Sequence, residues 1–177
     1  MKLKYKILII LTPAVFVADQ LSKLAVERWM PLGQRIPIIP GLFDLVHYRN
    51  TGAAFGIFSG MADSIRVPFF YIVAIVALVL LALFYRSLRD RDVLLSVALS
   101  LIFGGIAGNI ADRIRLGSVI DFLSFHIGDS VVNTNILGKH IYFPLEWPAF
   151  NIADSAITIA MALLFYSVLL GRKGVNE

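Results

Sequence analysis

Two aspartates, Asp121 and Asp154, are the residues of this sequence best suited to acid–base chemistry. Asp121 follows the apolar pair Val119–Ile120, and Asp154 lies near the start of an apolar run that begins at Phe150. Two carboxylates that meet in a partly dry site do not both ionise readily, so one of them should hold a proton near neutral pH. The ionised partner could then take a proton from water as it attacks a carbonyl, while the protonated partner donates to the developing oxyanion. Such a pair is suited to hydrolysing a peptide bond.

The same aspartates allow other functions. Carboxylates at a membrane edge also serve as structural ion pairs or as proton relays in transporters. A small proton-coupled transporter is therefore the alternative, in which Asp19, Asp121 and Asp154 would form a relay across the membrane. A relay predicts polar groups at several depths, whereas the apolar runs 67–85 and 93–111 contain no formal charge. This pattern favours a site on one side of the membrane, and the transporter stays open as the alternative. A non-catalytic assembly protein is a third hypothesis, and no feature of the sequence favours it.

Six other polar residues are expected near the outer ends of three helices: Asp19, Lys23, Asn109, Asp112, Arg113 and Asn151. An ionisable group at membrane depth costs about 2.5 to 3.5 kcal/mol, so each is a candidate for function or for a structural ion pair. Asp19 should pair with Lys23, four residues along the same helix face, or with Arg113. The spacing i, i+3 and i+4 places Asn109, Asp112 and Arg113 on one face of another helix, where they could orient a carboxylate or contact substrate.

Gly104 and Gly108, four residues apart, precede this polar face. Small residues at this spacing let a second helix approach closely, so both glycines are expected to serve packing. A metal is not expected, because the sequence has no cysteine and because His47, His126 and His140 lack a recognisable zinc-binding spacing.

The composition indicates which elements must position these residues. The 177 residues are 58% apolar and only 16% charged, and the mean hydropathy is +0.80, which is typical of an integral membrane protein. Four apolar runs are long enough to cross a hydrocarbon core about 30 Å thick. The expected fold class is all-α, with four transmembrane helices over about 7–26, 67–85, 93–111 and 150–170.

The basic residues predict the orientation of these helices. Eight of the 16 Lys and Arg lie in the short flanks 1–6, 86–92 and 171–177, and basic flanks are typical of the cytoplasmic side. Both termini should therefore be cytoplasmic, and the polar residues should face outward. Because the net charge of +4 reflects this topology, no nucleic-acid partner is expected.

The rest of the chain forms two outward connections, 27–66 and 112–149, so residues 1–177 should form a single membrane domain. The segment Ile36 to Asn50 mixes β-branched and aromatic residues, which predicts a small β-rich element in the first outer connection, lying on the membrane surface. The second connection has a strand-like start at Val119 to Phe125.

Five short blocks follow one another along the chain: Asp19-Gln20-Leu21-Ser22-Lys23, Asn50-Thr51-Gly52-Ala53-Ala54-Phe55, Gly104 to Arg113, Val119-Ile120-Asp121-Phe122, and Pro148 to Ala156. Together they resemble the lipoprotein signal peptidase family, also called signal peptidase II. The similarity extends from the first helix to the last. One departure is the stretch Phe122 to Trp147, which is longer than the family's pattern because Gly128 to Lys139 looks like an insertion that could modify a lid.

The resemblance implies an aspartic endopeptidase that cleaves the signal peptide from diacylglyceryl-modified prolipoproteins, on the amino side of the lipidated cysteine. It assigns catalysis to Asp121 and Asp154. The residues implied to shape the site or to contact substrate are Asp19, Asn50, Asn109, Arg113, Asn151 and Ala153. No metal or organic cofactor is implied, and the expected partners are the prolipoprotein and membrane lipid. The implied location is the bacterial cytoplasmic (inner) membrane, with the active site at its outer face, and the chain is expected to be monomeric.

Overall fold

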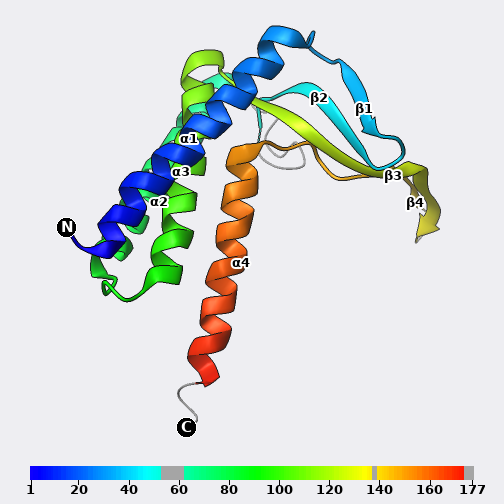
Figure 1. Ribbon diagram of the computed structural model, residues 1–177. Helices are drawn as coiled ribbons and strands as arrows, with labels where there is room; N and C mark the ends of the chain where they lie inside the picture. The colour runs from blue at the N-terminus through cyan, green and yellow to red at the C-terminus, as the bar shows by residue number, and fades with distance from the viewer. Residues whose placement is uncertain (53–61, 137–138, 174–177) are drawn as a thin grey trace.

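The computed structural model describes residues 1–52, 62–136 and 139–173. It contains four long helices, α1 (Leu3–Trp29), α2 (Asp63–Ser87), α3 (Val93–Leu116) and α4 (Ile152–Lys173) (Figure 1). Each helix includes an apolar segment long enough to cross a membrane, which confirms the four predicted spans. The start of α1 and the end of α4 lie on the side of the bundle away from the sheet. The cytoplasmic placement of both termini stays a prediction.

All four helices continue beyond at least one end of the apolar runs that predict them. α1 reaches Trp29 and α3 reaches Leu116, because polar residues at the membrane interface do not interrupt helical hydrogen bonding. α3 ends where Gly117 adopts a left-handed conformation with φ of 68° and its N–H bonds the carbonyl of Arg113 at 3.0 Å. The last turns of α3 therefore carry Asp112 and Arg113.

Glycines bring α3 close to both of its neighbours. A Cβ atom at Gly104 would lie 2.7 Å from the Cβ of Val15 on α1. A Cβ atom at Gly105 would lie 2.6 Å from the backbone oxygen of Ala153 on α4. Since real side chains do not tolerate these distances, only glycine allows α1 and α4 to pack this closely on α3. The packing role predicted for Gly104 is present.

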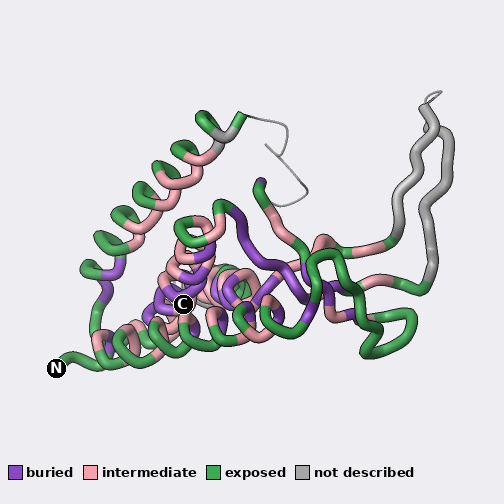
Figure 2. The backbone as a smooth tube through the Cα atoms, turned by 90° about the horizontal axis from the view of Figure 1, so that it is seen from above, coloured by how far each residue is buried: buried purple, intermediate pink, exposed green. Residues whose placement is uncertain are grey.

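α2 stands apart from the other helices and exposes most of its apolar side chains. Its inner end is fastened by the buried Lys4, whose ammonium donates to three carbonyl oxygens, those of Tyr85, Arg86 and Leu88, at 3.4, 3.0 and 2.6 Å. Toward its outer end the helix leans away from the rest of the bundle (Figure 2). The exposed apolar surface of α2 suits contact with lipid.

The two outer connections together form one antiparallel sheet of four strands in the order β1 (Arg35–Ile39), β2 (Phe43–Asn50), β3 (Val119–Ile136) and β4 (Lys139–Glu146). The β-rich element is thus larger than the one expected in the first connection alone. A two-stranded hairpin is marginal by itself, and β3 supplies the partner that β2 needs. The register places Tyr48 opposite Asp121 and Asn50 opposite Val119.

The described part of the stretch Gly128 to Lys139, predicted as an insertion, lies in the hairpin of β3 and β4. The backbone pairs Val131 with Pro144 and Ile136 with Lys139. This hairpin extends away from the helices (Figure 1). It lengthens the sheet at the end remote from the helices, so its backbone does not cover Asp121 at the other end of β3.

Candidate active site

Asp121 on β3 and Asp154 in the first turn of α4 line the same cavity, whose volume is about 980 Å³. The backbone explains how they come together. Phe150, just before α4, pairs with Leu123 on β3 through hydrogen bonds of 2.9 and 3.0 Å. This pairing ties the beginning of α4 to the strand that carries Asp121.

Asp121 accepts a hydrogen bond on each oxygen. Asn50 donates from Nδ2 to Oδ2 at 3.0 Å, and Asn151 donates from Nδ2 to Oδ1 at 2.8 Å. The orientation of both amides is fixed by backbone N–H groups, which can only donate. Gly52 donates to Oδ1 of Asn50 and Asp154 donates to Oδ1 of Asn151, each at 3.0 Å. Each amide nitrogen must therefore face Asp121.

Asp154 also has a partner on each oxygen. Asn109 donates from Nδ2 to Oδ1 at 2.8 Å, and the backbone N–H of Asn151 lies 3.3 Å from Oδ2. Asn151 thus contacts both aspartates, one through its side chain and the other through its backbone. The two carboxylates belong to one hydrogen-bonded unit.

The surroundings of Asp121 change its proton affinity. Burial and the nearby charge of Asp154 raise the pKa of Asp121 to about 7, although hydrogen bonds from Asn50 and Asn151 and the charge of Lys23 oppose the change. Near neutral pH this carboxyl group can therefore either hold or release a proton.

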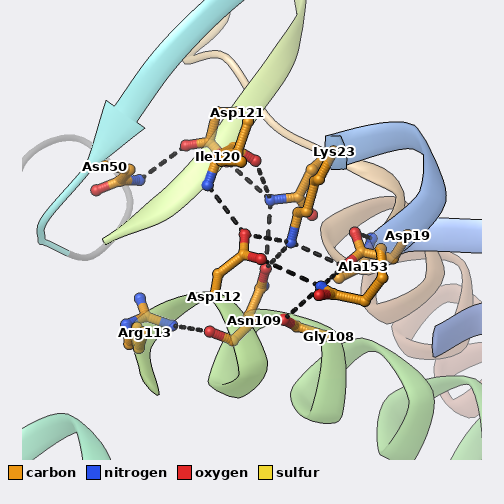
Figure 3. Close-up of polar contacts among 12 residues, drawn as sticks. Asp19, Lys23, Asn50, Gly108, Asn109, Asp112, Arg113, Ile120, Asp121 and Ala153 are labelled. Carbon is orange, nitrogen blue, oxygen red and sulfur yellow. Dashed lines mark hydrogen bonds and ion pairs between the residues drawn. The ribbon is translucent and has the colours of Figure 1, made fainter. Parts of the chain in front are cut away.

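A buried ionic cluster of Asp19, Lys23 and Asp112 lies close to Asp121 (Figure 3). The ammonium of Lys23 lies 2.8 Å from Oδ2 of Asp19 and 3.0 Å from Oδ2 of Asp112, and all three side chains are fully buried. The ion pair that the i, i+4 spacing of Asp19 and Lys23 predicts is present. Lys23 also donates to Oδ1 of Asn109 at 2.9 Å, which joins the cluster to Asp154.

Arg113 occupies the other side of Asn109. Its guanidinium contacts the backbone oxygens of Asn109 at 3.5 Å and Gly52 at 3.3 Å, and it lies 4.9 Å from the centre of the Phe70 ring. Arg113 also lines the cavity. It links α3 to the segment after β2, which are two parts of the cavity wall, and it also contacts α2.

The remaining predicted residues support this cluster. A Cβ atom at Gly108 would lie only 3.0 Å from Cγ of Asp19, so glycine is needed there for the carboxylate to fit. The backbone N–H of Ala153 donates to Oδ1 of Asp19 at 2.9 Å. Gly108 and Ala153 therefore act through their backbones.

Sequence reasoning did not single out Gln20, which belongs to the cluster. Its Nε2 bonds the carboxylates of Asp19 and Asp112 at 3.2 and 3.1 Å and the backbone oxygen of Gly108 at 3.1 Å. The sequence feature that could have identified Gln20 is its position inside the block Asp19 to Lys23. Trp147 and Tyr48, which line the cavity, were also not identified.

The described residues contain no group of three His, Cys, Asp or Glu side chains that could hold a metal ion. His47 lies apart from the aspartates and contacts the backbone oxygen of Met30 at 2.8 Å through Nδ1. His126 lies on the sheet, where Nε2 is 3.1 Å from Asp44. His140 carries no described side chain.

The chain is similar to known peptidases over nearly its whole length. The sequence model of a family described as Signal peptidase (SPase) II matches residues 11–170. The chain is 44% identical to a lipoprotein signal peptidase of Geobacter metallireducens, over 93% of this chain and 91% of that protein. It is 42% identical to one of Syntrophotalea carbinolica, over 91% and 89%, and 36% identical to one of Staphylococcus aureus, over 93% and 90%.

Two solved structures, both of bacterial membrane enzymes studied by the in meso method, resemble this fold. The structure at 2.3 Å resolution has a TM-score of 0.75 and 32% identity, and the match covers 94% of this chain and 90% of that chain. The structure at 1.9 Å resolution has a TM-score of 0.70 and 33% identity, with 92% of each chain covered. Helices and sheet therefore recur together in known membrane enzymes.

Proposed function

The chain belongs to the signal peptidase II family, and we propose that Asp121 and Asp154 form the catalytic dyad with which it cleaves signal peptides from prolipoproteins. The observation that carries this proposal is the bridge made by Asn151, which donates to Asp121 from its side chain and contacts Asp154 with its backbone N–H. This bridge holds two carboxyl groups of different chain segments in one cavity.

The dyad works with one shared proton. The ionised aspartate takes a proton from a water molecule as the water attacks the scissile carbonyl carbon, and the protonated aspartate donates to the carbonyl oxygen. The proton taken from water then passes to the leaving amine as the C–N bond breaks. As the C=O bond re-forms, a hydroxyl proton of the tetrahedral intermediate returns to the dyad, which again holds one proton. A pKa near 7 for Asp121 keeps both protonation states accessible, and the two groups titrate as a unit.

The cavity suits a substrate that is part peptide and part lipid. Asn50, Asn109 and Arg113 provide polar groups beside the dyad, while Ile157 and Ile159 of α4 provide apolar wall. The substrate is a prolipoprotein whose cysteine already carries diacylglycerol, and the bond on the amino side of that cysteine is cut. Its acyl chains stay in lipid while the scissile bond reaches the dyad. The dyad faces outward from a bacterial cytoplasmic membrane.

A proton-coupled transporter fits the described residues less well. Among the described residues of the four helices, the buried polar ones outside the site are Ser96, Ser100 and Lys4. Ser96 and Ser100 bond helix carbonyls at 2.9 and 2.6 Å, and Lys4 caps the inner end of α2. Each of these polar groups donates its hydrogen bonds to backbone oxygens close to it. They offer no chain of carboxylates that could pass protons from the dyad to the inner side.

The test is cleavage of a diacylglyceryl-modified prolipoprotein by the purified protein in detergent, beside the unlipidated precursor. Asp121→Asn and Asp154→Asn are each expected to abolish cleavage, because an amide fills the same space but cannot exchange the proton. Asp44→Asn is the matched control, since Asp44 is a buried carboxylate on the neighbouring strand that pairs with Arg35 at 2.8 Å.

The expected result is that only the lipidated precursor is cut, by the parent and by Asp44→Asn. Substantial cleavage by either purified dyad variant would remove that aspartate from the dyad. Equal cleavage of the unlipidated precursor would remove the requirement for the lipid.

A further inference from the structure

Lys23 has a complete set of hydrogen-bond acceptors although no part of it reaches solvent. Its ammonium has three protons and three acceptors, Oδ2 of Asp19 at 2.8 Å, Oδ2 of Asp112 at 3.0 Å and Oδ1 of Asn109 at 2.9 Å. The side chain is fully buried, and Lys23 does not line the cavity. Substrate therefore cannot be its partner, and its effect on the reaction must pass through other residues.

The contact with Asn109 determines which way that amide points. An ammonium can only donate, so the atom of Asn109 that faces Lys23 must be the oxygen, and the nitrogen must face the other way. On that other side the nitrogen donates to Oδ1 of Asp154 at 2.8 Å. Without Lys23, only the longer contact from Nδ2 of Asn151, at 3.3 Å, would hold the oxygen of Asn109 in place. The amide could then turn over and present its oxygen to the carboxyl group of Asp154.

The two carboxylates that pair with Lys23 each accept a hydrogen bond from the backbone N–H of the residue before a member of the dyad. Asp19 accepts from the N–H of Ala153 at 2.9 Å, one residue before Asp154. Asp112 accepts from the N–H of Ile120 at 3.1 Å, one residue before Asp121. One ammonium thus connects the two chain segments that must approach each other.

The geometry points to Lys23 as a positioning residue of the dyad, which orients Asn109 toward Asp154 and holds the backbone ahead of both aspartates through Asp19 and Asp112. This inference rests on the dyad proposed above. Lys23 affects the position of the two carboxyl groups relative to each other, and the catalytic roles of Asp121 and Asp154 stay the same.

Lys23 also contributes to the electrostatic balance of the site. The charged groups around the dyad are Asp19 and Lys23 of α1 and Asp112 and Arg113 of α3. The positive charge of Lys23 lowers the pKa of Asp121. Removing that charge leaves two unpaired carboxylates behind the dyad, and both changes favour the protonated form of Asp121. The dyad works with one proton, and the loss of the proton from Asp121, whose pKa is about 7, sets the alkaline limb of the pH–rate profile. That limb should therefore move to higher pH.

The experiment compares Lys23→Met with Lys4→Met, using the lipidated precursor across a range of pH. Lys4 is the matched control because it is a buried lysine on the same helix whose ammonium donates to three backbone oxygens at the inner end of α2, away from the dyad. For Lys23→Met, kcat is expected to fall about a hundredfold with little change in KM, and the alkaline limb of the pH–rate profile is expected to move up by about one pH unit. For Lys4→Met, the profile is expected to match that of the parent.

The position of a pH limb does not depend on how much of the enzyme is folded, so it separates positioning from a loss of folded protein. If Lys23→Met gives the parental profile and kcat, the inference is overturned. If that variant does not accumulate in folded form, Lys23→Met combined with Asp112→Asn removes one charge of each sign. A folded double variant is expected to keep a reduced kcat, and parental kcat would overturn the inference.

The dyad is tested separately by its own variants. If Asp121→Asn or Asp154→Asn retains activity, the dyad itself fails. If both are inactive while Lys23→Met behaves like Lys4→Met, only the role of Lys23 fails.

Discussion

Asp19 on α1 accepts a hydrogen bond from the backbone N–H of Ala153 on α4, at 2.9 Å and across a sequence separation of 134 residues. The contact fastens the first turn of the last helix to the first helix. Asp154 lies in that turn, so the place of one dyad carboxyl group depends on a residue near the other end of the chain.

The bridge made by Asn151 should matter for the chemical step. Asn151→Ala removes the donor to Oδ1 of Asp121 and the acceptor for the N–H of Asp154. We expect kcat to fall about a hundredfold while the protein remains folded, because the carboxyl groups lose a shared restraint. Thr12→Ala is the control, since it also removes a hydrogen bond between elements, the 3.0 Å bond to Ser100. Equal kcat values for the two variants would contradict the role given to Asn151.

The raised pKa of Asp121 should be visible in the pH dependence of stability. The folded-state pKa is about 7, above the usual value of 3.8. The stabilising effect of the protonated group is therefore complete below about pH 4 and is lost as pH rises to about 7. Asp121→Asn should abolish this loss and so gain stability relative to the parent across that window, by at most about 4 kcal/mol. Thermal unfolding in detergent at pH 4 to 8 measures it, and parallel curves for parent and variant would refute it.

Gly108→Ala should damage both stability and activity. The added methyl group would meet Cγ of Asp19 at 3.0 Å and overlap the carboxylate that binds Lys23. We expect the free energy of unfolding to fall by about 1 to 3 kcal/mol, with kcat reduced as well. Ile114→Ala, at a position 71% exposed on the same helix, is the comparison. Unchanged stability of Gly108→Ala would mean that Asp19 can move without cost.

Lys4→Met should weaken the inner end of the bundle without affecting catalysis. The ammonium of Lys4 satisfies carbonyl oxygens at the end of α2, which have no partner within the helix. Losing these charged hydrogen bonds should cost about 1.5 to 3 kcal/mol. Calorimetry or thermal unfolding in detergent would detect the change, and Lys6→Met, at an exposed position of the same helix, should show little. A lower kcat for folded Lys4→Met would show that α2 influences the dyad.

Chelating agents should leave cleavage unaffected. The carboxylates of Asp19 and Asp112 are already bonded to the ammonium of Lys23, and the dyad carries out its chemistry with a proton. The measurement is kcat/KM in EDTA, with a zinc peptidase in the same buffer as the positive control. A loss of activity that added divalent metal restores would show that a metal takes part.

The hydrophobic spans could be predicted because they depend on local composition. A run such as 93–111 has no charge, and any chain with that composition enters the membrane as a helix. The ion pair of Asp19 with Lys23 was also accessible, because residues four apart always share a helix face. Both predictions need only the geometry of one helix.

The sheet and the ionic cluster could not be predicted from any single element, because each forms by contacts between several elements. Nothing local to Val119–Phe125 specifies that it pairs with Phe43–Asn50, and so the sheet was expected in the first connection alone. Asn50 and Ala153 were predicted as site residues only from the resemblance to a family. Their contacts with Asp121 and Asp19 join segments that are far apart in sequence.

The sequence by itself determined the class of this protein, its four spans and the residue types at the site, because hydropathy and helical spacing are properties of neighbouring residues. Only the tertiary structure decided that Lys23 lies between Asp19 and Asp112 and that Asn109 turns its nitrogen toward Asp154. These contacts depend on how closely α1 and α4 pack on α3 and on how β3 aligns with β2. Such distances follow from the mutual fit of several elements, which no single segment encodes.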